Sequence, residues 1–238
     1  MRDVQTVLFD LDDTLHDDTL AYQSAADEVA REVAAEHNVD ALLLKRAYIA
    51  QAEGFWTQLS AQALSQKLGP VRETLWGNAL REVGLDDRDV AVRAAKNYNA
   101  YRAKYLRMFP GAVELLRGLK ARGAKLGLLT NGFAETHREK IALLQIGEYF
   151  DAIFIADEVG MLKPDPLLFA HACTKLQSSP SHSAMVGDRY ERDIRGAREA
   201  GLYTIWMNVH GARLPAGAPP PDVTVETVAG VAAALGVT

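Results

Sequence analysis

The stretch that decides the fold runs from residue 4 to residue 15 and reads VQTVLFDLDDTL. Its largely apolar part, residues 4–9, predicts a short buried strand that ends directly in a cluster of acids, residues 10–14. Open parallel sheets bind ligands beyond the carboxyl ends of their strands. We therefore expect Asp10 and Asp12 to lie at a functional site.

The residues that follow this cluster carry a helical pattern over a long stretch. Ala26, Val29, Ala30 and Val33 recur at spacings of three and four, the period of one helix face. Similar patterns occupy residues 42–50, 71–83 and 90–105, with breaks at residues 38–40, 69–70 and 84–86. These patterns predict an all-helical domain of residues 17–105, inserted into a second domain formed by residues 1–16 and 106–238.

From residue 112 onward, predicted strands and helices alternate. Strands are expected at residues 125–129, 152–155, 183–186, 203–206 and 222–225, and helices at residues 112–122, 134–144, 165–176, 193–200 and 228–235. This alternation predicts an α/β fold with a doubly wound parallel sheet covered by helices on both faces. The Pro-rich residues 213–221 are expected to form a surface loop.

Polar side chains also follow the later strands of this predicted sheet. Thr130 and Asn131 come after the second strand, Lys163 after the third, and Asp188 and Asp193 after the fourth. Because the carboxyl ends of parallel strands share one edge of the sheet, these residues are expected to converge on one crevice with the first acidic cluster.

Four carboxylates in one crevice repel each other and raise each other's pKa unless cations neutralise them. An oxygen-rich site of this kind suits Mg²⁺, and phosphoryl transfer is the natural chemistry of such a site. Asp10 is the expected nucleophile on phosphorus. Asp12, two residues on, can protonate the leaving oxygen and then deprotonate the hydrolytic water. The Thr130 hydroxyl, the Asn131 backbone amide and the Lys163 ammonium are expected to hold the phosphate.

Taken together, these motifs resemble those of a known family. FDLDDTL at residues 9–15, LTNG at 129–132, KPDP at 163–166, and VGD at 186–188 with Asp193 are similar to the four ordered motifs of the haloacid dehalogenase superfamily. The resemblance covers essentially the whole chain, and its spacing is that of members with a helical cap between the first two motifs. It implies a Rossmann-like core in which Asp10, the backbone carbonyl of Asp12, and Asp188 hold Mg²⁺. It also implies that Asp193 orients Lys163 or the metal shell.

The resemblance also separates the chemistries found within this superfamily. Its dehalogenases attack carbon, need no Mg²⁺ and lack an acid at the position of Asp12, so Asp12 favours a phosphatase. Phosphomutases share the core, but they need a second acceptor site, of which the sequence gives no independent sign.

The substrate is less well defined by the sequence. Residues 130–133, 157–160, 188–194 and 206–210 resemble the branch with bacterial nucleoside 5′-monophosphatases and N-acylneuraminate-9-phosphatase. A nucleoside 5′-monophosphate is therefore the first expectation. A sugar-phosphate or phosphoglycolate phosphatase and a non-catalytic binding protein are the alternatives.

Several other side chains are expected near the site, in the core or on the surface. We expect His16, Asp17 and Asp18 in a solvated hinge, His137 on the surface, and Arg189 either at the substrate phosphate or a partner, or in solvent. Cys173 is expected to be a core thiol, and Arg192, Arg195 and Arg198 are expected to form a solvated helix face. The cap carries six aromatic residues, of which one or two are expected to face the crevice while the others fill the cap core. They are Phe55, Trp56, Trp76, Tyr98, Tyr101 and Tyr105.

The composition narrows the partners. The 238 residues carry a formal net charge of −5, which argues against a nucleic acid polymer as partner. No stretch approaches the ~18 apolar residues of a membrane-spanning helix, and the N-terminus lacks the pattern of a secretion signal. The single cysteine excludes an internal disulfide. We expect a cytoplasmic monomer or homodimer that binds a small-molecule phosphate ester and no membrane.

Overall fold

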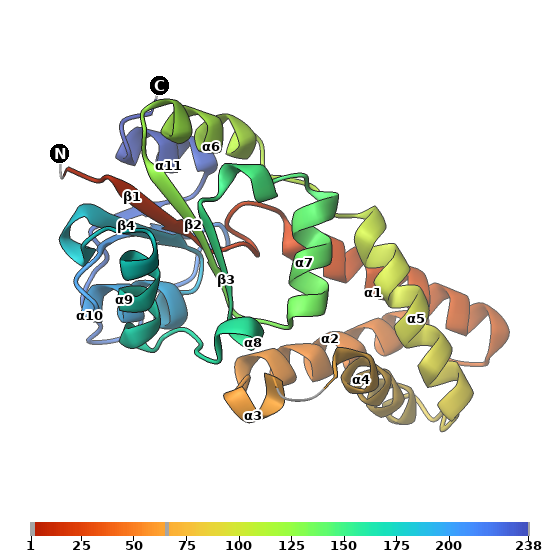
Figure 1. Ribbon diagram of the computed structural model, residues 1–238. Helices are drawn as coiled ribbons and strands as arrows, with labels where there is room; N and C mark the ends of the chain where they lie inside the picture. Colours follow the sequence, from red (N-terminus) through yellow and green to blue (C-terminus); the bar gives the residue numbers. More distant parts are fainter. Residues whose placement is uncertain (1–2, 65–66, 238) are drawn as a thin grey trace. The chain divides into compact units, whose positions relative to one another are not determined.

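The computed structural model describes residues 3–64 and 67–237 and divides the chain into two compact units. The first, here called the core unit, comprises Met1–Asp17 and Arg107–Thr238, and the second, the helical unit, comprises Asp18–Leu106 (Figure 1). The chain therefore leaves the core unit after its first strand and returns to it once.

A six-stranded parallel sheet forms the centre of the core unit. Its order is β3-β2-β1-β4-β5-β6, so the chain builds outward from β1 in one direction and then in the other. The strands are β1 (Thr6–Phe9), β2 (Lys125–Thr130), β3 (Ala152–Ile155), β4 (Ser183–Gly187), β5 (Tyr203–Met207) and β6 (Val223–Val225). This arrangement confirms the predicted doubly wound α/β fold.

Helices cover both faces of this sheet (Figure 1). They are α6 (Ala112–Ala121), α7 (Ala134–Leu143), α8 (Ala156–Val159), α9 (Pro166–Lys175), α10 (Arg195–Glu199) and α11 (Val228–Ala234), with short helical turns at Gly147–Tyr149 and Pro180–His182. Successive side chains of β1 point to opposite faces. Val7 and Phe9 lie in one apolar cluster with α6 and α11, whereas Leu8 lies in another with α9 and α10. Ile141 of α7 belongs to the cluster of Phe9, which anchors α7 beside the end of β1.

The segment after β4 differs from its prediction. A helix was expected over residues 193–200, but a π-helical turn (Tyr190–Ile194) comes first and α10 follows. In this turn the backbone amide of Asp193 donates to the Arg189 carbonyl at 2.7 Å, and the Asp193 carboxylate accepts from the Arg189 amide at 2.9 Å. π-turns are rare and frequently mark functional sites. Here the turn places Asp193, which is fully buried, at the end of β4.

The helical unit has a core of its own. Its helices are α1 (Asp18–Glu36), α2 (Ala41–Thr57), α3 (Ala61–Leu64), α4 (Leu68–Glu82) and α5 (Arg88–Lys104). Asp40 and Asp87 cap α2 and α5 by accepting hydrogen bonds from the first turn. Trp76 stacks on Tyr48 with ring centroids 3.9 Å apart. Trp76 and Tyr98 are buried, as expected of aromatics that fill this core, and the other four candidates are partly exposed.

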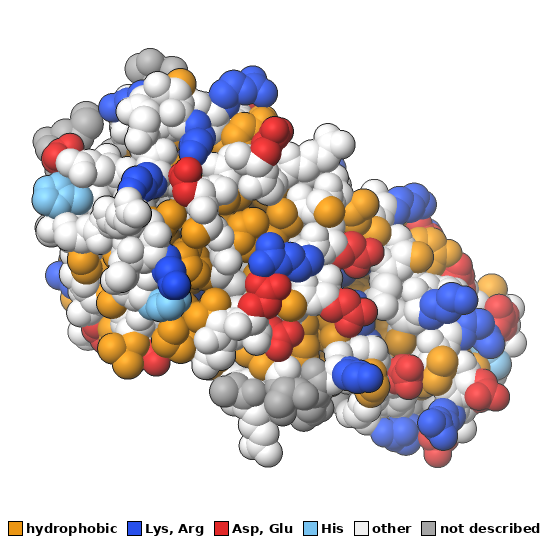
Figure 2. Space-filling view, in the orientation of Figure 1, with side chains coloured by type: hydrophobic (Ala, Val, Ile, Leu, Met, Phe, Trp, Pro, Cys, Tyr) orange, Lys and Arg blue, Asp and Glu red, His pale blue; other side chains and the backbone are white. Residues whose placement is uncertain are grey.

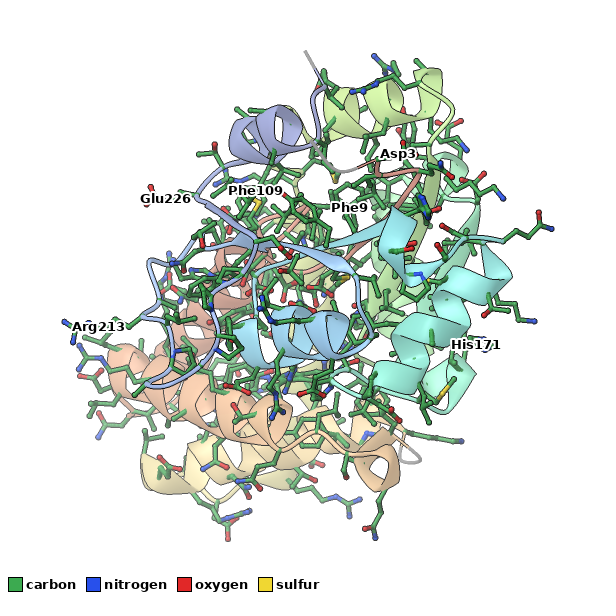
Figure 3. All side chains as sticks on the ribbon, turned by 90° about the vertical axis from the view of Figure 1, so that its left-hand side faces the viewer. Asp3, Phe9, Phe109, His171, Arg213 and Glu226 are labelled. Carbon is green, nitrogen blue, oxygen red and sulfur yellow. The ribbon has the colours of Figure 1, made fainter. Side chains whose placement is uncertain are left out.

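The surface carries charged side chains of both signs, as expected from the composition. On the face in Figure 2, Lys and Arg side chains lie among Asp and Glu side chains and do not gather into one basic patch. Figure 3 shows Phe9 in the interior of the core unit and Arg213 extending outward from the exposed loop that precedes β6. Among the described helices, none is long and apolar enough to cross a membrane.

Candidate active site

The candidate site lies where β1 and its two neighbours end. β1 pairs with β2 on one side and with β4 on the other, and the Asp10 amide donates to the Val186 carbonyl at 2.9 Å. Because the three strands are parallel, their carboxyl ends bring Asp10, Thr130 and Asp188 to one edge of the sheet. This edge is the topological switch point at which doubly wound sheets bind ligands.

Lys163 is the electrostatic centre of this site. Its Nζ lies 2.6 Å from Asp10 Oδ1 and 2.6 Å from Asp193 Oδ1, and all three residues are buried. Burial disfavours the ammonium, but the two carboxylates outweigh this effect and raise the pKa of Lys163. A charged lysine therefore joins β1, the loop before α9 and the turn after β4.

The backbone of Lys163 is positioned by Asn131. The Asn131 side chain donates to the Lys163 carbonyl and accepts from the Lys163 amide, both at 2.8 Å. A Cβ at Gly196 would lie 2.4 Å from the carbonyl oxygen of Pro164, so the glycine allows this loop to pack directly on the helix after β4. The sequence suggested a phosphate-binding role for the Asn131 amide, and the structure adds a tie between two motifs.

Glycine also makes room for Asp193. A Cβ at Gly187, the last residue of β4, would lie 2.4 Å from the Asp193 carboxylate carbon. The absence of a side chain at this position allows the carboxylate to fold back over the strand end toward Lys163. The structure thus places Asp193 where it can orient Lys163.

Three carboxylates of this site could hold a metal ion. Oxygen atoms of Asp10, Asp188 and Asp193 all lie within 4.8 Å of one another. Burial raises the pKa of Asp10 to about 7, with Asp193 and Asp12 adding to the rise and Lys163 opposing it. Burial, followed by the charges of Asp193 and Asp10, raises the pKa of Asp188 well above its ordinary value. A buried set of oxygen donors with excess negative charge suits a hard divalent cation such as Mg²⁺.

Asp12 lies among basic side chains instead. Lys140 Nζ lies 2.6 Å from its Oδ1 and 2.7 Å from its Oδ2, and His16 Nε2 lies 2.8 Å from Oδ1. His137 Nε2 lies 3.5 Å from Oδ2. Burial favours protonated Asp12, but the positive charge of Lys140 and the neighbouring His137 and His16 side chains outweigh it and hold the pKa of Asp12 well below its ordinary value.

Two of these residues correct the expectations from the sequence. His137 was expected on the surface and His16 in a solvated hinge, yet their relative exposures are 2% and 0%. α7 packs one face against the core through Ile141, and His137 lies four residues earlier on that face. Lys140 was not singled out from the sequence. Its spacing of three from His137 was the available signal, because residues three apart share a helix face.

Two further residues of the site are Thr130 and Arg189. Thr130 is the last residue of β2 and is buried, with its side chain at the strand end where a phosphate-binding hydroxyl was expected. The side chain of Arg189 is 67% exposed, while its Nε lies 3.2 Å from Asp188 Oδ2. Arg189 is therefore a largely solvated cation at the rim of the carboxylate cluster.

Comparison with known proteins gives consistent matches. Residues 4–201 match the family described as haloacid dehalogenase-like hydrolase. Phosphoserine phosphatase from Thermus thermophilus is 31% identical, with 86% of this chain and 89% of the relative covered. N-acylneuraminate-9-phosphatase from Rattus norvegicus is 31% identical, with 94% and 91% covered. The crystal structure of the HAD-hydrolase YfnB from Bacillus subtilis has a TM-score of 0.78 at 23% identity, with 98% and 99% covered.

Proposed function

Because this chain belongs to the haloacid dehalogenase-like hydrolase family, we propose that it hydrolyses small-molecule phosphate monoesters through an aspartyl-phosphate on Asp10, with Mg²⁺ as cofactor. The two relatives named above match most of its length and are phosphatases, and the chain is a phosphoric monoester hydrolase. The observation that supports the mechanism best is the contact of Lys163 with both Asp10 and Asp193 at the switch point of the sheet.

In the first step, a carboxylate oxygen of Asp10 attacks phosphorus. The new bond joins Asp10 to phosphorus and the bond from phosphorus to the leaving oxygen breaks. Asp12 must enter this step in its protonated form, and it gives its proton to the leaving oxygen. In the second step, water attacks the phosphorus of the aspartyl-phosphate and Asp12 takes its proton. The bond between phosphorus and Asp10 breaks, and inorganic phosphate is released with both aspartates regenerated.

The residues proposed to bind the phosphate lie at or after the carboxyl ends of the same parallel strands. The Thr130 hydroxyl and the Asn131 amide donate to phosphate oxygens, and the Lys163 ammonium balances their charge. Asp10, Asp188 and the backbone carbonyl of Asp12 would hold Mg²⁺, with Asp193 acting through Lys163. The cation supplies positive charge that neutralises the clustered carboxylates and the phosphoryl group.

We propose a nucleoside 5′-monophosphate as the first substrate to test, because residues 130–133, 157–160, 188–194 and 206–210 resemble the nucleotidase branch. The second class is sugar and acid phosphates. The two relatives named above carry the names of such substrates, phosphoserine and N-acylneuraminate 9-phosphate. These molecules share a phosphate monoester and little else, so the leaving group must be identified by experiment.

The deciding experiment measures release of phosphate and halide from a panel of nucleotides, sugar phosphates, phosphoserine, phosphoglycolate and haloacids. Each compound is tested with Mg²⁺ and with EDTA, and Asp10→Asn serves as the blank. Phosphate release that requires both Mg²⁺ and Asp10 supports the proposal, and the fastest class names the substrate. Equal rates in EDTA would contradict the role of Mg²⁺, and halide release without metal would contradict the phosphatase assignment.

A further inference from the structure

The basic cluster around Asp12 has no part in the mechanism described so far. Phosphate binding uses Thr130, Asn131 and Lys163, whereas Lys140, His16 and His137 contact a carboxylate that binds no phosphate in the proposed reaction. Burying a lysine ammonium costs free energy, which its pairing with a carboxylate offsets only in part. We therefore ask what function the buried contact of Lys140 with Asp12 serves.

The cluster approaches Asp12 from the interior. The side chains of Lys140, His137 and His16 are 3%, 2% and 0% exposed, while that of Asp12 is 30% exposed. The basic groups therefore contact the buried side of the carboxylate, and its exposed side is left for the substrate.

The two oxygens of Asp12 receive different numbers of contacts. A carboxylate oxygen has two lone pairs. Oδ1 accepts from both Lys140 and His16. Oδ2 accepts from Lys140 at 2.7 Å, and His137 Nε2 at 3.5 Å is too distant for a hydrogen bond. Among the described contacts, Oδ2 keeps a lone pair that can carry the proton of the reaction.

The absence of a side chain at Gly132 makes room for the His137 ring of this cluster. A Cβ at Gly132 would lie 2.0 Å from His137 Cε1, so the histidine ring occupies the space a side chain would fill. The ring is oriented by the Phe133 carbonyl, which accepts from Nδ1 at 3.0 Å. The His137 ring thus packs beside Oδ2 of Asp12. Lys140, three residues further along α7, contacts the same carboxylate.

We propose that Lys140 is a positioning residue that, together with His16 and His137, fixes the Asp12 carboxylate so that Oδ2 exchanges the proton with the leaving group and with water. This inference rests on the proposed acid and base roles of Asp12. It assigns Lys140 no contact with the phosphate. A mispositioned Asp12 then impairs only those steps in which a proton must move.

The test uses two esters that differ in their need for a proton. The phenolate of p-nitrophenyl phosphate leaves without being protonated, whereas the alkoxide of an alkyl phosphate must be protonated as it leaves. The alkyl ester used is the alkyl phosphate that is hydrolysed fastest in the panel described above. The ratio kcat/KM reports the steps up to phosphoryl transfer to Asp10. The value of kcat also includes hydrolysis of the aspartyl-phosphate, where Asp12 must take a proton from water with either ester.

The variants are Lys140→Met, Lys140→Arg, Asp12→Asn and the matched control Lys125→Met. Lys125 begins β2 at the opposite end from Thr130, and its Nζ donates to the Leu176 carbonyl at 2.8 Å. Circular dichroism confirms that each variant is folded. If Lys140→Met does not fold, Lys140→Gln, which keeps an N–H donor, takes its place.

For Lys140→Met, kcat/KM with the alkyl ester is expected to fall about 100-fold, the effect of moving a reacting group by about 1 Å. With the aryl ester kcat/KM stays near that of the unaltered protein, and kcat falls with both esters. Lys140→Arg recovers part of the loss because a guanidinium can also contact both oxygens. Lys125→Met shows no difference between the esters.

Three outcomes separate the possibilities. Equal losses of kcat/KM with both esters in Lys140→Met, or none with either, overturn the positioning role if Asp12→Asn still shows the alkyl-specific loss. Absence of that loss in Asp12→Asn overturns the proposed role of Asp12 and this inference with it. Turnover by Asp10→Asn would instead overturn the covalent mechanism.

Discussion

Lys163 Nζ lies 2.6 Å from Oδ1 of Asp10, although the two residues are 153 positions apart in the sequence. The pair is buried, and Asp193 Oδ1 also lies 2.6 Å from Lys163 Nζ.

Replacement of the nucleophile is expected to abolish turnover. Asp10→Asn should lower kcat by at least about 10⁴-fold, because an amide does not form the acyl phosphate. Mass spectrometry of the acid-quenched protein should show a phosphorylated species in the unaltered chain and none in the variant. Asp151→Asn is the control, since Asp151 also pairs with a lysine, Lys120 at 2.7 Å, but lies directly before β3 and away from the strand ends that carry the site. Substantial residual activity in Asp10→Asn would contradict nucleophilic attack by Asp10.

Removal of Lys163 is expected to destabilise the core unit. Lys163→Met leaves Asp10 and Asp193 buried without their shared cation, and breaking a buried pair in this way costs about 3–5 kcal/mol. Urea denaturation measures the change in the free energy of unfolding. Lys120→Met breaks a partly exposed pair, with both side chains 36% exposed, and is expected to cost about 0–1 kcal/mol. Similar losses in the two variants would indicate that the Lys163 pair is not held tightly in solution.

The raised pKa of Asp10 predicts how pH affects the metal-free protein. A carboxyl whose pKa is raised to about 7 in the folded state from 3.8 binds its proton more tightly when folded. Its contribution to stability is complete below pH 4 and is lost as pH rises through about 7. Asp188 acts in the same direction, whereas Asp12, whose pKa is lowered, contributes stability that is lost as pH falls below its ordinary value. The thermal midpoint measured in EDTA should therefore decrease as the pH is raised from 5 to 8.

Added Mg²⁺ should reverse this effect. A cation that binds the ionised carboxylates competes with protons, so its stabilisation is small at pH 5 and grows toward pH 8. At a concentration 100 times its Kd the gain is about 2.7 kcal/mol. Asp188→Asn is expected to remove most of this gain, whereas Asp151→Asn should retain it. A shift of the thermal midpoint that is the same at both pH values, or that survives in Asp188→Asn, would argue against metal binding at these carboxylates.

A methyl group at Gly132 is expected to disturb the Asp12 cluster. Because the added Cβ overlaps the His137 ring, Gly132→Ala must shift the ring or the backbone, at a cost of about 1–3 kcal/mol. Gly54→Ala provides the contrast. Gly54 lies within α2 with no other atom near the added Cβ, so alanine there is expected to stabilise by about 0.5–1 kcal/mol. Thermal denaturation compares the two, and equal effects would contradict the tight seating of His137.

The sequence alone was sufficient for the order of the six strands, for the longer helices between them and for the positions of the polar motifs, but not for α3, α8 or the π-helical turn after β4. A buried strand that ends in acids, such as residues 6–12, is recognisable because strand burial and the polar loop after it are both properties of neighbouring residues. The parallel sheet then follows from the alternation of strands and helices, and it requires the strand ends to share one edge. Asp10 and Asp188 are close for this reason.

Only the tertiary structure decided which side chains face Asp12 and Lys163. Lys140 and Asp12 are 128 residues apart in the sequence, and their contact depends on the rotation of α7 about its axis as it packs through Ile141. The same rotation buries His137, which local pattern had placed on the surface. A helical period shows which residues share a face but not which face meets the sheet, because that choice is made by packing against strands far away in the chain.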